Sequence, residues 1–295
     1  MLLVAVLVLV LVLILIGIQY KDTILGIEDV AGIMAKKLEV VSRMRIDLLK
    51  SVDAEKSAVM ADTDESSQAF ADQAQKAAEA VDRGRLELGL LVKKDHTDQE
   101  MKLLQEFDGC WIEFRKIDRV LLEFAVKNTN IKAANLSFVK GSEAMKRFEK
   151  ALNDLNRKRP LGAEGTQIGK LAGDALAAGL KIHYLHAPHI AAANDEQMDK
   201  IEVDIKQNEE GIKRSLNELQ RLIPEKKQAS LQEARTAYDE LAKVTTEVID
   251  LSRQNTNIKS FELSLGRKRK LTAQCDEILI SLQEAVRSRS FKATR

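Results

Sequence analysis

Amphipathic segments separated by short polar breaks fill the chain after residue 20. Within each segment, apolar residues recur at steps of three and four, which is the spacing of a helix with one buried side. Polar breaks such as residues 61–64 interrupt this periodicity and mark helix ends. The pattern predicts an all-α protein with helices at 24–59, 65–91, 97–125, 131–155, 166–193 and 194–222, followed by further helices toward residue 295.

The fourth predicted helix has the clearest buried seam. Its apolar positions alternate strictly between steps of three and four residues, as they do in helices that pack in bundles. The seam residues are Ile131, Ala134, Phe138, Gly141, Met145, Phe148, Leu152 and Leu155.

A polar phrase occurs twice in the chain. NTNIKAANLSF begins at Asn128, and NTNIKSFELSL begins at Asn255. Asn-Thr-Asn before an apolar-periodic run is typical of a helix start, because a side-chain oxygen at the N-cap accepts from backbone N–H groups. The same shift of 127 residues places Tyr238 on Trp111 and keeps most of the fourth-helix seam. We interpret this as a duplicated helix pair whose turn is written twice.

The duplication predicts two antiparallel four-helix bundles in tandem. The first bundle covers residues 20–157, a linker covers 158–165, and the second bundle covers 166–295. In this arrangement, Asn128 and Asn255 occupy matching corners of two similar bundles.

The first 18 residues form an almost unbroken apolar run, and the first charged residue is Lys21. A signal peptide would carry a basic start and a small-residue cleavage site, which this run lacks. A helix of about 18 residues just suffices to cross a hydrocarbon core of roughly 30 Å. We therefore predict a transmembrane anchor at residues 1–19, whose orientation is left open because no basic residues precede it.

Charge and cysteine content do not change the predicted fold. Lysine plus arginine (46) nearly cancel aspartate plus glutamate (45), so no overall field attracts nucleic acid. The two cysteines, Cys110 and Cys275, lack the spacing of a metal or redox motif. Cys275 falls on the apolar seam, where it is predicted to be a small buried residue.

The sequence lacks the patterns that a catalytic helical bundle needs. No histidine has a glutamate three residues before it, as a di-iron carboxylate centre requires. Haem-attachment, phosphate-binding and nucleophile motifs are also missing. We predict that the protein is not an enzyme and has no cofactor.

One histidine cluster is a candidate metal site. His183, His186 and His189 recur at three-residue intervals, so on a continuous helix their imidazoles share one side. Pro188 interrupts or kinks this turn, and no carboxylate or cysteine lies at a supporting spacing. The alternative is that the three are interfacial or ordinary packing histidines.

Three further residues are candidates for ligand binding. Arg45 lies between apolar residues on the seam of the first helix, where it needs an anion: either a carboxylate on a neighbouring helix or dimer partner, or a ligand. Trp111 and its equivalent Tyr238 could line a pocket, but the helical spacing of Trp111 beside Phe107 and Phe114 favours the alternative of a core position.

The run WIEFRKIDRVLLEFAVKNTNIKAANLSF resembles the four-helix-bundle sensory module of bacterial methyl-accepting chemotaxis receptors. In that family, an aromatic residue on the third helix precedes an apolar run, a polar turn and an Ala- and Leu-bearing fourth helix. The resemblance covers residues 37–155 and reaches the rest through the repeat. Matching positions are Trp111, Val120, Leu121, Ala125, Asn128, Asn130, Ala134 and Leu136.

This resemblance implies a ligand-binding region outside the cytoplasmic (inner) membrane that forms a homodimer. Its ligand would be an organic acid, an amino acid or an aromatic acid bound between helices, and binding would shift one helix to signal. Nucleic acid is not an expected partner. The alternative is a membrane-tethered structural or interaction protein, a helical spacer or a pore-former-like assembly, that needs no small-molecule ligand.

Overall fold

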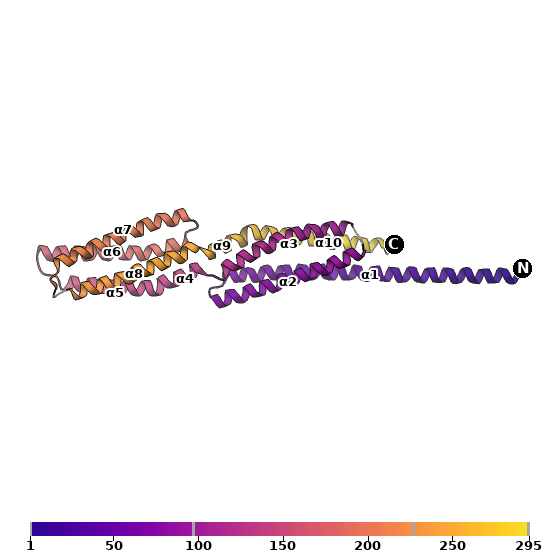
Figure 1. The fold of residues 1–295 in the computed structure, drawn as a ribbon, viewed down its shortest axis with the longest axis horizontal. Helices are drawn as coiled ribbons and strands as arrows, with labels where there is room; N and C mark the ends of the chain where they lie inside the picture. Colours follow the sequence, from indigo (N-terminus) through magenta and orange to yellow (C-terminus); the bar gives the residue numbers. More distant parts are fainter. Residues whose placement is uncertain (1, 96–97, 226–227, 294–295) are drawn as a thin grey trace. The chain divides into compact units, whose positions relative to one another are not determined.

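The computed structural model describes the backbone of residues 2–95, 98–225 and 228–293, and the side chains of 30–94, 98–225 and 228–289. The described residues are helical and include no β-strand, which confirms the all-α prediction (Figure 1). The elements are α1 (Leu2–Met60), α2 (Asp64–Asp95), α3 (Asp98–Ala125), α4 (Thr129–Leu136), η1 (Ser137–Gly141), α5 (Ser142–Arg157), α6 (Ala163–Ala191), α7 (Asp195–Leu222), α8 (Ala229–Gln254), α9 (Thr256–Leu263), η3 (Ser264–Lys268) and α10 (Arg269–Ala293), where η marks a π-helical turn.

The chain forms two compact units. Unit 1 consists of Met1–Ala61, Glu65–Val126 and Glu262–Arg295, and unit 2 consists of Asp62–Asp64 and Lys127–Phe261. In unit 1, α10 packs against α1 and α3. In unit 2, α6 packs against α7, and the continuous rod made of α4, η1 and α5 packs against α8.

The predicted tandem division at residues 158–165 is therefore wrong. Each unit combines the first three helices of one repeat copy with the fourth helix of the other copy, so the two fourth helices are exchanged. The third and fourth helices of each copy are joined at a single left-handed asparagine, Asn128 or Asn255. Periodicity did not reveal the exchange because both copies carry equivalent seams, and each seam suits either set of three helices.

None of the helices in the described part of the chain has the length and apolar content needed to cross a membrane. The predicted anchor at residues 1–19 falls among residues whose side chains lie outside that part.

A stack of three aromatic rings on α3 forms the centre of the unit 1 core. Trp111 stacks on Phe114 at 4.6 Å between ring centroids and on Phe107 at 5.9 Å. In unit 2, Phe148 and Tyr238 occupy the corresponding interior. Burying such side chains contributes about 2 kcal/mol each or more.

A π-helical turn occurs at the same place in both copies. Ser137–Gly141 and Ser264–Lys268 are related by the 127-residue shift of the repeat. The extra residue of a π-turn rotates the preceding helix, so the predicted seam is wrong before Gly141. Phe138 is 78% exposed and Ala133 is buried in place of Ala134. From Met145 onward, the predicted seam is confirmed.

A disulfide joins α3 to α10 within unit 1. Cys110 and Cys275 form this bond with Cα atoms 5.9 Å apart. Cys275 is fully buried as predicted, but as half of a cystine instead of a lone thiol. The pairing was missed because the tandem assignment placed the two cysteines in different bundles. At the equivalent positions, unit 2 has Ala237 and Phe148.

Candidate functional sites

The two copies of Asn-Thr-Asn meet inside unit 2, and we name residues 128–130 and 255–257 the asparagine clasp. Thr129 N–H donates to Thr256 Oγ1, and Thr256 N–H donates to Thr129 Oγ1, both at 3.2 Å. Asn130 N–H donates to Asn257 Oδ1 at 3.1 Å, and Asn257 N–H donates to Asn130 Oδ1 at 3.2 Å. Each helix start is thus capped by the other copy, not by its own side chain as the sequence predicted.

The outer asparagines complete the clasp. Asn128 (φ 49°) and Asn255 (φ 53°) are left-handed, a conformation that asparagine tolerates better than most residues. Asn130 Nδ2 donates to Asn255 Oδ1 at 2.8 Å, and Asn257 Nδ2 donates to Asn128 Oδ1 at 3.0 Å. Because the outer asparagines are almost completely buried, these bonds satisfy groups that water cannot reach.

Asn257→Ala should lower the free energy of unfolding by about 1–3 kcal/mol, because it leaves the buried Asn130 N–H and Asn128 amide oxygen without partners. Urea unfolding followed by circular dichroism measures the change. Asn153→Ala, at an exposed helical position, is the matched control and should stay within about 0.5 kcal/mol of wild type. Equal effects of the two substitutions would show that the clasp is not stabilising.

A row of histidines on α6 contacts the π-turn η1 and helix α8 in unit 2. His183 Nε2 donates to the Ser137 carbonyl at 3.2 Å. Thr245 donates its hydroxyl proton to Leu241 O, so it must accept from His186 Nε2–H at 3.0 Å. Neutral His186 then accepts from Ser137 Oγ through Nδ1 at 2.9 Å. Burial, with smaller effects of the neighbouring His183 and His189, lowers the pKa of His186 to about 4.

His186 should make unit 2 acid-sensitive. Its folded pKa of about 4 lies below the unfolded value of 6.5, so the unfolded chain binds more protons between these values, and stability falls as pH decreases through this window. The shift corresponds to about 3 kcal/mol. His186→Gln should remove this part of the pH dependence, measured as the difference between urea unfolding curves at pH 7 and about pH 4.5. Unchanged pH dependence in the variant would contradict the assignment.

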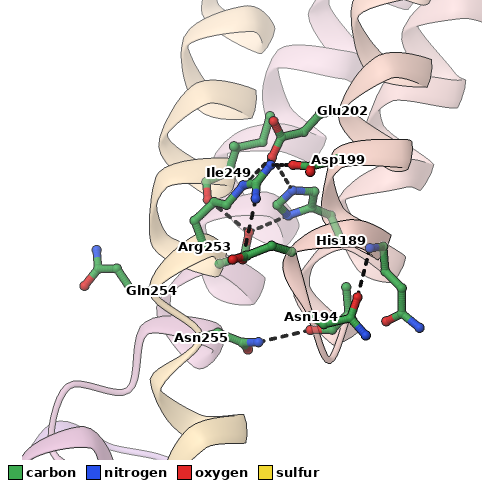
Figure 2. A network of polar contacts seen from close by, with 12 residues as sticks. His189, Asn194, Asp199, Glu202, Ile249, Arg253, Gln254 and Asn255 are labelled. Carbon is green, nitrogen blue, oxygen red and sulfur yellow. Dashed lines mark hydrogen bonds and ion pairs between the residues drawn. The ribbon is translucent and has the colours of Figure 1, made fainter.

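His189 belongs to a separate polar network, drawn in Figure 2. Its Nε2 donates to Glu202 Oε1 at 2.9 Å, and its Nδ1 lies 2.6 Å from Ser252 Oγ. Arg253 also donates to Glu202 Oε1 at 2.7 Å and pairs with Asp199, and the bond to Glu202 raises the pKa of Arg253. The network joins α6, α7 and α8 beside Asn255 of the clasp.

The ring nitrogens of the three imidazoles thus bond to different protein atoms: His183 and His186 to Ser137 and Thr245, and His189 to Ser252 and Glu202. Among the described residues, no group of three His, Cys, Asp or Glu side chains is arranged to hold a metal ion. The predicted metal site at His183, His186 and His189 is not formed, and the alternative of packing histidines describes what the rings do.

A buried charged cluster occupies the centre of unit 1. Lys268, from the π-turn η3, is bonded to Asp118 of α3 and lies 3.6 Å from Glu55 Oε2 of α1, and all three side chains are at most 2% exposed. The Lys268 ammonium also lies 4.2 Å from the centroid of the Phe114 ring. The repeat places Gly141 and Thr245 at the positions of Lys268 and Asp118, so unit 2 has no such charges there.

Glu55 is the incomplete member of this cluster. Both of its carboxylate oxygens and the nearby Ser51 hydroxyl are buried, and none of them makes a hydrogen bond of ordinary length and angle to a described residue. Burial raises the pKa of Glu55; the charge of Lys268 and the Ser264 side chain oppose this shift, and the charge of Asp118 adds to it. A buried carboxylate without a well-formed hydrogen bond is costly, and such groups often mark a functional or strained position.

The side chains of the three predicted ligand-binding residues are bonded to or buried among other residues of the protein. Arg45 makes a bidentate bond to Asp276 at 2.7 and 3.2 Å, which is the internal salt bridge of the two alternatives. Trp111 donates to Asp82 at 2.6 Å from the aromatic core of unit 1. Tyr238 is buried in the core of unit 2, whereas Arg45 and Trp111 belong to unit 1.

Sequence reasoning missed the cluster of Glu55, Asp118 and Lys268. A signal for it existed, because Glu55 lies on the apolar stripe of the first helix and Lys268 lies on the repeated seam. Charged residues at seam positions need partners, but the partners come from other helices and cannot be paired by periodicity.

Comparison with protein-family models, with curated proteins and with solved structures finds no match to this chain. The function must therefore be argued from the geometry of the two units.

Proposed function

We propose that this chain is the extracytoplasmic sensory region of a chemotaxis-type transmembrane receptor. The observation that carries the proposal is the buried position of Lys268 between two carboxylates: it is hydrogen-bonded to Asp118 and lies 3.6 Å from Glu55. We propose that Lys268 can shift its hydrogen bond from Asp118 to Glu55, and that the two pairings correspond to two arrangements of α10. A ligand that prefers one of them by a few kcal/mol shifts the population, which is the requirement for signalling by helix displacement.

Two further features support this location and role. Disulfides persist in oxidising compartments, so the Cys110–Cys275 bond favours the extracytoplasmic side. The apolar run at residues 1–18 suits a membrane anchor. We also propose that the receptor is a homodimer, which light scattering of the purified protein can establish.

The test is a ligand screen on the full chain in lipid nanodiscs. A panel of organic acids, amino acids and aromatic acids is tested for thermal stabilisation, and a true ligand at a hundredfold excess over Kd should raise Tm by about 5 °C. Trp111 is the only tryptophan in the chain, so its fluorescence reports on unit 1. No response across a broad panel would argue strongly against a receptor.

The exposed apolar side chains favour a second function. Phe138, Leu90 and Ile112 are 78%, 71% and 63% exposed. A membrane-tethered structural or interaction protein, such as a helical spacer or a pore-former-like assembly, would use them as contact surfaces. Deleting residues 1–18 and measuring vesicle leakage distinguishes the two: leakage by the full chain without any ligand favours the pore-former.

A further inference from the structure

An apolar cleft lies at one end of unit 2. It is formed by the end of α5, the start of α6, the end of α7 and the start of α8 (Figure 1). The asparagine clasp contacts the opposite end of α6, so the cleft lies at the end of the unit away from the clasp. Its volume is about 580 Å³, within the usual range of ligand pockets. The apolar part of its lining includes Leu155, Ile168, Leu222 and Ile223, which together suit a hydrocarbon chain.

Two basic side chains of the lining have no acidic partner. Lys158 Nζ donates to Ser230 Oγ at 3.4 Å, and Arg159 donates to the amide oxygen of Asn156, so both hydrogen bonds go to neutral groups. Within the described part of the chain, no carboxylate oxygen lies within 4.0 Å of either cation. The carboxylate of the lining is Glu164, so the cations outnumber it. The mouth of the cleft therefore carries positive charge that is available to an anion.

The chain between α5 and α6 follows a tight path beside the cleft. Gly162 has a φ of 95°, a conformation that favours glycine. A Cβ on Gly165 would lie 1.7 Å from the Pro160 carbonyl oxygen, so the close contact there requires glycine. Thr166 donates both its N–H and its hydroxyl to the Gly162 carbonyl, at 3.0 and 3.1 Å. This tight connection presents Leu161, which is completely exposed to solvent.

The combination of these features favours a lipid as the partner. Membrane-surface segments bind by burying apolar side chains among acyl chains and by placing Lys and Arg against anionic headgroups. Leu161 supplies the exposed apolar side chain, and Lys158 and Arg159 supply the cations. An anionic phospholipid carries both matching parts in one molecule: a phosphate for the two cations and a hydrocarbon chain for the cleft.

We infer that this end of unit 2 docks on an anionic phospholipid surface. Lys158 and Arg159 bind a lipid phosphate, one acyl chain of that lipid enters the cleft over Ile168 and Ile223, and Leu161 inserts among the neighbouring chains. This membrane contact is additional to the anchor proposed at residues 1–19. It goes beyond the proposed sensory function and does not depend on it, because it involves neither a sensed ligand nor the cluster around Lys268.

The first experiment measures binding of the full chain to a second membrane. The chain is placed in phosphatidylcholine nanodiscs, so that the apolar run at residues 1–18 is already in lipid, and is then floated with vesicles. Vesicles of phosphatidylcholine containing about 30% phosphatidylglycerol should bind at least about tenfold more tightly than pure phosphatidylcholine vesicles, and high salt should weaken this binding. Equal binding to the two kinds of vesicle would overturn the inference.

Removing the two cations should weaken binding to the anionic vesicles. We expect a loss of about twentyfold for Lys158→Gln/Arg159→Gln, because each basic residue near an anionic surface contributes several-fold. Lys206→Gln/Lys213→Gln removes the same charge from exposed positions of α7 in the same unit and should bind like the wild type. If this control loses as much affinity as the first variant, the binding reflects overall charge and the site is wrong.

The exposed leucine is tested separately from the charges. Leu161→Asn should weaken binding to the anionic vesicles by about tenfold, because an apolar side chain no longer leaves water. Val203→Asn, an exposed apolar position of α7, is the matched control and should leave binding unchanged. Circular dichroism should show the same helix content in all four variants. Wild-type binding by Leu161→Asn would overturn the insertion of this residue.

A soluble lipid tests the cleft itself. Calorimetric titration of the full chain in nanodiscs should detect dihexanoyl phosphatidylglycerol below its micellar concentration, and inorganic phosphate should bind at least about tenfold more weakly because it cannot fill the apolar cleft. If phosphate binds as tightly as the lipid, the cleft takes no acyl chain. If polyglutamate binds as tightly as the anionic vesicles and Leu161→Asn changes neither affinity, the partner is an acidic protein and the lipid assignment is wrong.

Discussion

The double variant Cys110→Ala/Cys275→Ala should lose about 4–5 kcal/mol of unfolding free energy, the largest effect we expect from any small change. The disulfide spans 165 residues of sequence, and the conformational freedom that such a bond removes from the unfolded chain increases with the logarithm of the loop length. It also joins the third helix of one repeat copy to the fourth helix of the other copy. The bond thus stabilises the exchanged arrangement, and equilibrium unfolding in urea measures its contribution.

A reductant provides the matched control for this prediction. Dithiothreitol should lower the stability of the wild type to that of the double variant and should leave the variant unchanged. Unit 2 has Ala237 and Phe148 at the equivalent positions, so its own unfolding should not respond to reduction. A loss below about 1 kcal/mol would contradict the expected role of the bond.

Lys268→Met should destabilise unit 1 by about 3–5 kcal/mol, because it leaves Asp118 and Glu55 buried without a cation. Adding Glu55→Gln and Asp118→Asn removes both uncompensated charges and should restore most of the loss. Lys270→Met, at an exposed position of α10, is the control and should cost less than about 0.5 kcal/mol. Urea unfolding monitored by Trp111 fluorescence measures these changes, because Trp111 lies in unit 1.

The same cluster predicts a pH dependence of defined sign. Because the folded pKa of Glu55 is raised, the folded protein binds more protons than the unfolded chain above the ordinary glutamate value. Stability should therefore fall as pH rises from 4.5 through the raised pKa, and Glu55→Gln should remove this contribution. The slope should be steeper in Lys268→Met, where the opposing ammonium is gone. If the dependence of stability on pH is unchanged in both variants, the raised pKa does not belong to Glu55.

Local features of the structure followed from local sequence. The Asn194 side chain caps α7 by accepting from Gln197 N–H at 3.0 Å, and Gln197 Oε1 accepts from Ala193 N–H. Such reciprocal bonds are expected for a polar cap before an apolar-periodic helix. The repeat was also readable, since the two π-turns and the two left-handed asparagines recur at the shift found in the sequence. Such features depend on residues within one or two turns of each other.

The candidate sites were less accessible to sequence reasoning. Arg45 and Trp111 stood out as unusual residues, but each is engaged by a carboxylate of another helix, Asp276 for Arg45 and Asp82 for Trp111. Lys268 stood out less, because the role of a charged residue on a seam cannot be inferred until its neighbours from other helices are known. The π-turn that carries Lys268 inward has no periodic signature of its own.

By itself, the sequence determined that the chain is helical, that a helix pair is copied, and that Asn128 and Asn255 are helix junctions, because periodicity and capping are short-range properties. Only the tertiary structure decided which fourth helix enters which core. With it came the clasp between Asn130 and Asn257, the cystine and the position of Lys268 between two carboxylates. The physical reason is that duplicated seams are interchangeable as patterns, so the choice between pairings rests on contacts between side chains that lie far apart in the sequence.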